Sequence, residues 1–241
     1  MSNAEKPKYK RVLLKLSGEA LADKTGNSVI CHSMLDEVAD VIKKTVEAGV
    51  ELAVIVGAGN IWRGRQGSDM DRTRADHMGM LATVINAIAL EDALRRCHVG
   101  AHVMTAVDME GFAKRYDRDE AVSYIENGEV VIFGAGLGIP FISTDTAGAV
   151  RAAEIGADVI LFAKNIDGVY SADPKLDPNA VHYDKVTYDF ILENNVKVMD
   201  QTAASFCREN NIDMLVFALE KPENIYDAAF GHVSGTVVSA E

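Results

Sequence analysis

Positively charged, glycine and carboxylate residues gather in four short stretches of this sequence, each placed after an apolar run. The stretches span residues 15–18, 57–63, 134–145 and 164–173. Glycines let backbone amides approach an anion closely, and the N-terminus of a helix adds unpaired N–H groups and the positive end of a dipole. Lysine and arginine side chains bind phosphate oxygens through charge-assisted hydrogen bonds. Together these residue types are typical of phosphate chemistry.

The most glycine-rich of the four stretches has alternating glycines at positions 134, 136 and 138. It follows the apolar run 129–133 and precedes a helical pattern, so it predicts a strand, a loop and the capped start of a helix. Backbone amides exposed at such a loop favour an anion such as phosphate. In the alternative interpretation the glycines only make a tight connection, and one of residues 143–145 only caps the helix.

Lys15 lies inside the apolar run 11–18, which predicts a buried strand that ends in a Ser-Gly loop. A buried ammonium group is costly unless it is paired. We therefore expect Lys15 to face a ligand or a carboxylate. The alternative is an edge strand that leaves Lys15 in solvent.

A second glycine loop follows the predicted strand 51–56 and has two interpretations. Gly57 and Gly59 resemble the dinucleotide fingerprint of an NAD-dependent oxidoreductase, but that pattern needs a third glycine where this chain has Trp62. In the other interpretation the amides of residues 57–59 bind a phosphate while the guanidinium group of Arg63 forks onto it. The missing glycine favours the phosphate site.

The charged segment 69–74 is expected to precede a helix over residues 75–96. Asp76 falls in the predicted first turn, where a carboxylate complements the helix dipole. Alternatively, this carboxylate accepts hydrogen bonds from the hydroxyl groups of a sugar. The apolar residues that recur at helical spacing are Met78, Leu81, Ile85 and Ile88.

Bulk composition favours a small-molecule ligand, because a net charge of −12 and a pI near 4.9 disfavour nucleic acid and anionic membranes. The three cysteines show no metal or redox spacing, which indicates reduced thiols and a cytoplasmic protein. No apolar run reaches the roughly 20 residues that a membrane span needs. We expect residues 1–8 to be a disordered or tag-derived tail and residues 9–241 to form a single domain.

Apolar runs that predict strands alternate with helical patterns along the chain. The predicted strands lie at residues 11–18, 51–56, 101–106, 129–133, 158–163, 213–217 and 236–239, and the predicted helices at 33–49, 75–96, 119–127, 146–156, 188–194, 200–210 and 222–230. The first helix is expected to begin at Ser33, with Asp36 completing a capping pair. This order predicts an α/β fold with a mostly parallel sheet, helices on both faces and ligands at the carboxyl ends of the strands. The four charged stretches then converge on one crevice.

Six segments resemble the motifs of the bacterial uridylate kinases, a branch of the amino acid kinase superfamily. They are Lys-Leu-Ser-Gly-Glu at 15–19, Gly-Ala-Gly-Asn-Ile-Trp-Arg at 57–63, Asp-His-Met-Gly-Met-Leu-Ala at 76–82, Pro-Phe-Ile-Ser-Thr-Asp at 140–145, Asp-Gly-Val-Tyr-Ser-Ala-Asp-Pro at 167–174 and Val-Met-Asp at 198–200. The resemblance covers residues 9–239, and the segments 76–82 and 141–145 are similar to the UMP-specific branch. It implies a three-layer sandwich in which helices flank a mostly parallel central sheet.

The resemblance implies transfer of the γ-phosphoryl group of ATP to UMP, with Mg²⁺ accompanying the ATP and no protein side chain assigned as a metal ligand. The catalytic residues that it implies are Lys15, Arg63, Asp145 and Asp200, the two aspartates holding the lysines and the metal in place. The implied UMP-binding residues are Gly57, Ala58, Arg63, Asp76, Gly136, Leu137, Gly138, Ile139 and Thr144. The implied ATP-binding residues are Lys15, Leu16, Ser17, Gly18, Gly59, Arg63, Lys164, Asn165, Tyr170 and Asp173.

Ala58, Leu137 and Ile139 depart from the family's pattern, which often has glycine at the first position and a polar residue at the last. Under the resemblance, uracil is then recognised more by backbone groups than by side chains. The alternative function is a sensor that binds uridine nucleotides without turnover. The retained charges of Lys15, Asp145 and Asp200 argue against a sensor, because binding alone does not require them.

The resemblance also implies partners beyond the two substrates. It implies a homo-oligomer, usually a hexamer, with UTP as a feedback inhibitor. Activation by GTP is left open, because the segment that contains Glu91, Arg95 and His102 varies between branches of the family.

Overall fold

The computed structural model describes residues 5–23, 28–62, 69–172, 174, 176–219 and 221–241. Nine strands form one sheet in the order β4-β3-β5-β2-β1-β6-β10-β11-β9, and every neighbouring pair is parallel except β10 and β11. Their bounds are β1 (Arg11–Leu16), β2 (Glu51–Val56), β3 (Ala101–Thr105), β4 (Lys114–Arg115), β5 (Val130–Gly134), β6 (Val159–Lys164), β9 (Lys185–Thr187), β10 (Asp213–Ala218) and β11 (Gly235–Ser239). The short strands β7 (Val169–Tyr170) and β8 (His182–Tyr183) form a separate antiparallel pair.

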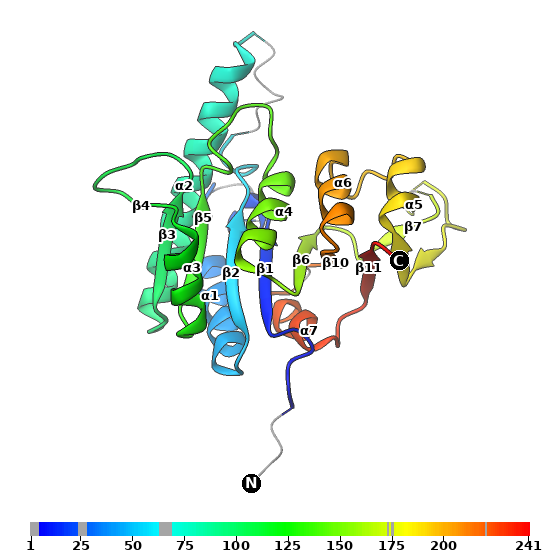
Figure 1. Cartoon of the computed structure of the whole chain (residues 1–241), viewed down its shortest axis with the longest axis horizontal. Helices are drawn as coiled ribbons and strands as arrows, with labels where there is room; N and C mark the ends of the chain where they lie inside the picture. The colour runs from blue at the N-terminus through cyan, green and yellow to red at the C-terminus, as the bar shows by residue number, and fades with distance from the viewer. Residues whose placement is uncertain (1–4, 24–27, 63–68, 173, 175, 220) are drawn as a thin grey trace.

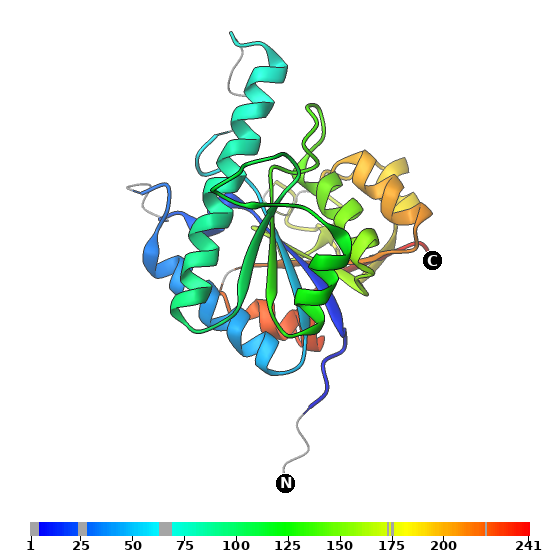
Figure 2. The ribbon, with the colours of Figure 1, turned by 60° about the vertical axis from the view of Figure 1, so that its left-hand side comes forward.

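Helices cover both faces of the sheet, as the order of elements predicts (Figures 1 and 2). One apolar core includes α1 (His32–Glu47), α2 (Arg72–Arg96) and α7 (Asn224–Phe230), and the other includes α3 (Arg118–Glu126), α4 (Thr144–Ile155), α5 (Tyr188–Glu193) and α6 (Gln201–Glu209). Alternate residues of a strand point to opposite faces, so Val12 and Leu14 enter the first core while Leu13 enters the second. The central strands are mostly apolar because both of their faces are buried.

Most helices begin within two residues of the predicted start, and two predictions about helix starts are wrong in a way that changes the cap. The helix α2 begins at Arg72, because the carboxylate of Asp71 accepts a hydrogen bond from the amide of Arg74 and caps it. The predicted start at residue 75 was therefore wrong. The predicted capping pair of Ser33 with Asp36 was also wrong, since α1 begins one residue earlier.

The N-terminal turns of α2 extend past the end of the sheet (Figures 1 and 2). Part of its apolar stripe consequently has no core to enter: Met78, Leu81 and Ile85 are 38%, 54% and 49% exposed. Ile88, farther along the helix, packs partly against the first core. Within the part of the chain that the structure describes, every helix is too short or too polar to cross a bilayer.

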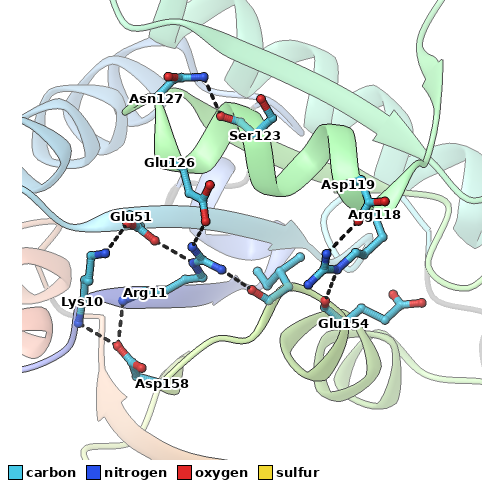
Figure 3. Close-up of polar contacts among 11 residues, drawn as sticks. Lys10, Arg11, Glu51, Arg118, Asp119, Ser123, Glu126, Asn127, Glu154 and Asp158 are labelled. Carbon is cyan, nitrogen blue, oxygen red and sulfur yellow. Dashed lines mark hydrogen bonds and ion pairs between the residues drawn. The ribbon is translucent and has the colours of Figure 1, made fainter.

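Arg11 ties four elements together at the amino ends of the strands (Figure 3). Its guanidinium group donates hydrogen bonds to Glu51 at 2.6 Å, to Glu126 at 2.8 Å and to the carbonyl of Ile155 at 2.8 Å. Its backbone amide donates to the carboxylate of Asp158. This network lies at the edge of the sheet opposite the charged stretches, so it stabilises the fold and leaves the carboxyl edge for chemistry.

Candidate active site

The four charged stretches follow four adjacent strands. In the sheet β5, β2, β1 and β6 are neighbours and all run parallel, so their carboxyl ends lie side by side. The crevice expected from the sequence is therefore located above the middle of the sheet.

One carboxylate at this edge pairs with two lysines. The Nζ atom of Lys15 lies 2.9 Å from Oδ1 of Asp145, and Nζ of Lys164 lies 3.8 Å from Oδ2 of the same residue. Both ammonium groups also lie over the ring of Phe162, at 4.7 Å and 4.3 Å from its centroid. Lys15 is only 7% exposed, so the paired interpretation of this residue is correct and the edge-strand alternative is wrong.

Burial lowers the pKa of Lys164 from its ordinary value, because desolvation disfavours the charged form. The neighbouring Lys15 lowers this pKa as well, while Asp145 and Asp200 raise it. The carboxylate of Asp145 therefore pairs with both lysines and opposes the effect of burial on the pKa of Lys164.

The cap of α4 places Asp145 beside the lysines. Ser143 is the cap, since its hydroxyl accepts hydrogen bonds from the amides of Asp145 and Thr146 at 3.0 Å and 3.1 Å. The hydroxyls of Ser143 and Thr146 both donate to Asp200. Asp200 in turn caps α6 by accepting from the amide of Ala203 at 2.9 Å. The two helix starts are thus locked together beside the charged cluster.

The glycine-rich loop before α4 contains four residues in the left-handed region. Gly136 and Gly138 have φ values of 57° and 75°, and Ala135 and Phe141 have values of 61° and 67°. Such conformations are strained for residues other than glycine and occur at functional sites. The amide of Ala135 donates to the hydroxyl of Thr83 at 2.8 Å, which fixes the start of the loop to α2.

A pocket of about 460 Å³ lies between this loop, α2 and the loop after β2. Its lining includes eight residues that the sequence assigned to nucleotide binding or catalysis: Ala58, Gly59, Asp76, Gly136, Leu137, Ile139, Thr144 and Asp200. Gly57 and Gly138 shape the backbone of the two loops instead. Arg63 lies outside the described residues.

The carboxylate of Asp76 faces this pocket and holds two of its walls together. It accepts hydrogen bonds from Nε of Arg72 at 2.9 Å and from the amide of Phe141 at 2.8 Å. The guanidinium group of Arg72 also lies over the ring of Phe141. Because α2 begins at Arg72, Asp76 lies beyond the first turn, and the helix-dipole alternative loses its basis.

Two further pockets lie on the other side of the lysines. One of about 300 Å³ is lined by Ser17, Lys164 and Asn165 among others, and one of about 640 Å³ contains Asn165 and Tyr170. The hydroxyl of Tyr170 donates to Asp167 at 2.8 Å, and its ring meets that of His182 edge-on. Asn165 joins these two pockets. Asp173, also expected here, lies outside the described residues.

The amino acid kinase family matches the chain over residues 10–218. The chain belongs to this family. Its fold is similar to that of UMP kinase from Bacillus anthracis, with 39% identity, coverage of 97% of each chain and a TM-score of 0.92. UMP kinase from Ureaplasma parvum is 40% identical over 96% of this chain and 99% of its own, with a TM-score of 0.91. Uridylate kinase from Archaeoglobus fulgidus is 31% identical over 94% and 99%, with a TM-score of 0.71.

The sequence analysis did not identify several residues that line these pockets. They are Trp62, Arg72, Gly79, Met80, Thr83, Phe141, Ser143 and Thr202 in the first pocket, and Ile166 and residues 196–198 in the largest one. Five of them lie on α2 or in the loop before it, and three of these five, Trp62, Gly79 and Met80, fall inside segments that resemble family motifs without having been assigned a role. Thr83 is buried in the structure, and its hydroxyl accepts the hydrogen bond from the amide of Ala135.

Proposed function

We propose that this chain transfers the γ-phosphoryl group of ATP to UMP, giving ADP and UDP. The observation that carries the proposal is the pairing of Lys15 and Lys164 on Asp145, between the 460 Å³ pocket and the two pockets beyond the lysines. The relatives from Bacillus anthracis and Ureaplasma parvum are UMP kinases. Phosphoryl transfer needs positioning and charge stabilisation rather than a covalent intermediate, and this cluster provides both.

The proposed arrangement assigns one nucleotide to each side of the lysines. UMP occupies the 460 Å³ pocket, with its phosphate at the loop of residues 57–59 and at Thr144, and its base against residues 136–139. ATP lies beyond Lys164, with its adenosine near Tyr170. Lys15 neutralises the transferring group, and Asp145 holds both lysines in place.

We propose that Mg²⁺ arrives with ATP. Magnesium prefers a few carboxylates together with phosphate oxygens and water. Within the described residues, no group of three or more His, Cys, Asp or Glu side chains is arranged as a metal site. Asp145 and Asp200 are the carboxylates nearest the transfer point, and both already accept contacts from protein donors. These two carboxylates therefore fit a metal that is held chiefly by phosphate oxygens. When bound, such a metal would neutralise charge on the transferring group.

A single assay tests the proposed reaction: ADP release from Mg-ATP with UMP, CMP, dUMP, N-acetylglutamate or aspartate offered in parallel. The expected result is rapid ADP release with UMP and much slower release with the others. Binding of UMP without ADP release would support the non-catalytic sensor instead. Release with an amino acid substrate alone would assign the chain to another branch of its family.

The substitution Asp76→Ala is expected to narrow the preference for UMP over dUMP about tenfold, the value of one hydrogen bond of about 1.4 kcal/mol to the ribose 2′-hydroxyl. The measurement is the ratio of kcat/KM for the two substrates. Asp71→Ala is the matched control, because it removes the cap of the same helix and lowers stability by about 1 kcal/mol without touching the pocket. If Asp76→Ala leaves the ratio of kcat/KM for UMP and dUMP unchanged, this carboxylate does not contact the 2′-hydroxyl and only links Arg72 to Phe141.

We propose that the chain assembles through α2, with a second copy of the chain as the partner. Exposed or half-exposed residues at a 4-3-4-3-4 spacing run along this helix: Arg74, Met78, Leu81, Ile85, Ile88 and Asp92. An antiparallel copy related by a two-fold axis sets Leu81 against Ile85, Met78 against Ile88 and Arg74 against Asp92. Apolar side chains thus meet at the centre and opposite charges at the ends.

The substitution Leu81→Glu is expected to produce a smaller species in light scattering coupled to gel filtration. Leu176→Glu is the matched control, since Leu176 is 83% exposed and far along the chain from α2. A particle mass equal to that of the control would place the interface elsewhere. The hexamer proposed for the full assembly requires a second kind of contact in addition to this one.

Inhibition by UTP is proposed because a uridine nucleotide can compete for the UMP pocket. Activation by GTP stays open, since Glu91 is engaged by Arg95 at 3.0 Å and by the amide of Val103, while His102 pairs with Glu129. Initial rates at fixed UMP, with UTP or GTP added separately, measure both responses.

A cytoplasmic location is proposed because all three cysteines are free thiols.

A further inference from the structure

Two asparagines form a reciprocal amide pair beneath the loop after β2. Nδ2 of Asn86 donates to Oδ1 of Asn60 at 2.8 Å, and Nδ2 of Asn60 donates to Oδ1 of Asn86 at 3.0 Å. Asn86 is completely buried in the middle of α2. A buried amide is costly unless its donors and acceptor are satisfied. Here Nδ2 of Asn86 also donates to the carbonyl of Gly57 at 2.8 Å.

The same pair reaches the neighbouring loop after β1. A Cβ atom placed on Gly18 would lie 2.2 Å from Oδ1 of Asn60, 2.8 Å from the carbonyl of Gly57 and 2.9 Å from the amide of Gly59. The two loops are therefore in backbone contact at this point, and the Asn60 side chain fills the space that a side chain at Gly18 would need. Nδ2 of Asn60 also donates to the carbonyl of Val29 at 2.6 Å.

The contacts of the pair span both sides of the proposed crevice. Residues 15–18 carry Lys15 and belong to the side of the transferring phosphoryl group, while residues 57–59 belong to the side of the acceptor phosphate. Asn86 joins the second loop to the long helix α2, and the side chain of Asn60 lies against the first loop. The backbones of the two loops are also joined directly, since the amide of Gly57 donates to the carbonyl of Leu16 at 2.8 Å.

We propose that Asn60 and Asn86 are positioning residues that set the distance between the phosphoryl donor loop and the acceptor loop. The inference rests on the proposed function, because it concerns the separation of two bound phosphates. Only an amide suits both positions: each side chain must donate and accept at once, which neither a carboxylate nor an apolar side chain of similar size can do. A displacement of about 1 Å between reacting groups can cost about a hundredfold in rate.

The test compares Asn86→Ala and Asn60→Ala with the wild-type protein. Each substitution is expected to lower kcat about a hundredfold while KM for ATP and for UMP changes less than about threefold, because each nucleotide still finds its own loop. The double variant is expected to lose no more than the larger single loss, since both residues act through one pair. Asn60 is only partly buried, so Asn60→Ala provides a folded protein if Asn86→Ala does not.

Tyr188→Phe is the matched control for a loss that affects stability alone. Tyr188 is fully buried, and its hydroxyl donates to the carbonyl of Ile212 at 2.7 Å in the other core. This control is expected to lower the melting temperature and leave kcat unchanged. Asparagine variants that behave like Tyr188→Phe, or a double variant whose losses multiply, would overturn the positioning role.

Failure of the proposed function has a different signature. In that case the wild-type protein itself releases no ADP with UMP. The rate of amide hydrogen exchange in residues 57–60 measures how firmly this loop is held, and the measurement does not require turnover. Faster exchange in both asparagine variants than in Tyr188→Phe is the expected result, and equal exchange would overturn the inference regardless of activity.

Discussion

The substitution Asp145→Asn is expected to lower kcat by about a thousandfold and to lower the melting temperature as well. The catalytic loss follows from removing the carboxylate that orients Lys15 and Lys164 at the transferring group. The stability loss follows from the burial of Lys15, because breaking a buried ion pair by removing one partner costs about 3–5 kcal/mol. Steady-state kinetics and thermal melts of the same preparation measure both effects.

A double variant, Lys15→Met with Asp145→Asn, separates the two effects. Replacing a buried ion pair by groups of similar volume is often neutral for stability, so most of the melting temperature is expected to return. Activity is expected to stay lost, since no ammonium group then faces the transferring phosphoryl. Asp189→Asn is the control pair breaker, because its partner Arg208 is at the surface and such pairs contribute about 1 kcal/mol or less. Recovery of activity in the double variant would remove Lys15 from the mechanism.

The pH dependence of kcat follows from the direction of the shift at Lys164. Its pKa is lowered chiefly by burial, so this lysine loses its proton at a lower pH than a lysine in water, and the rate falls on the alkaline side. Asp145 raises this pKa, so in Asp145→Asn the alkaline limb of the residual rate is expected to move to still lower pH. A limb that stays in place would show that another group controls it.

The sequence was sufficient to predict the crevice because parallel strands place all their carboxyl ends at one edge of a sheet. Four charged stretches followed four apolar runs, so β5, β2, β1 and β6 had to bring them together once the sheet was parallel. Lys15 was identifiable for a similar reason, since an ammonium group inside an apolar run requires a partner. These features depend on local patterns and on one rule of topology.

The remaining features depend on contacts between segments that are distant in the sequence. The apolar spacing of α2 is the same whether the stripe faces a core or solvent, so periodicity could not show that Leu81 is exposed. Phe141 lines the 460 Å³ pocket from a left-handed backbone conformation that its residue type does not suggest. Asn60 and Asn86 are common residue types, and only their reciprocal hydrogen bonds distinguish them.

The substitution Gly18→Ala is expected to lower kcat at least a hundredfold in a protein that still folds. Steric contacts alone exclude a side chain at position 18. A Cβ atom added to Gly18 would meet one side-chain atom and two backbone atoms of residues 57–60 within 3.0 Å. The backbone of the acceptor loop must then move away from the donor loop, and such overpacking costs about 1–3 kcal/mol. The measurements are kcat, KM for each nucleotide and the melting temperature.

Gly49→Ala is the control for the effect of a glycine substitution itself. Gly49 has a φ of 93°, and nothing lies within 4 Å of the added Cβ atom. Its replacement is therefore expected to lower stability by about 1–2 kcal/mol through backbone strain and to leave kcat unchanged. A second variant, Gly18→Ala with Asn60→Ala, removes the nearest obstacle but leaves the carbonyl of Gly57 and the amide of Gly59 in place. Activity is therefore expected to be lower in this double variant than in Asn60→Ala alone. Activity equal to that of Asn60→Ala would mean that the Asn60 side chain alone, rather than the backbone of the acceptor loop, conflicts with a side chain at position 18.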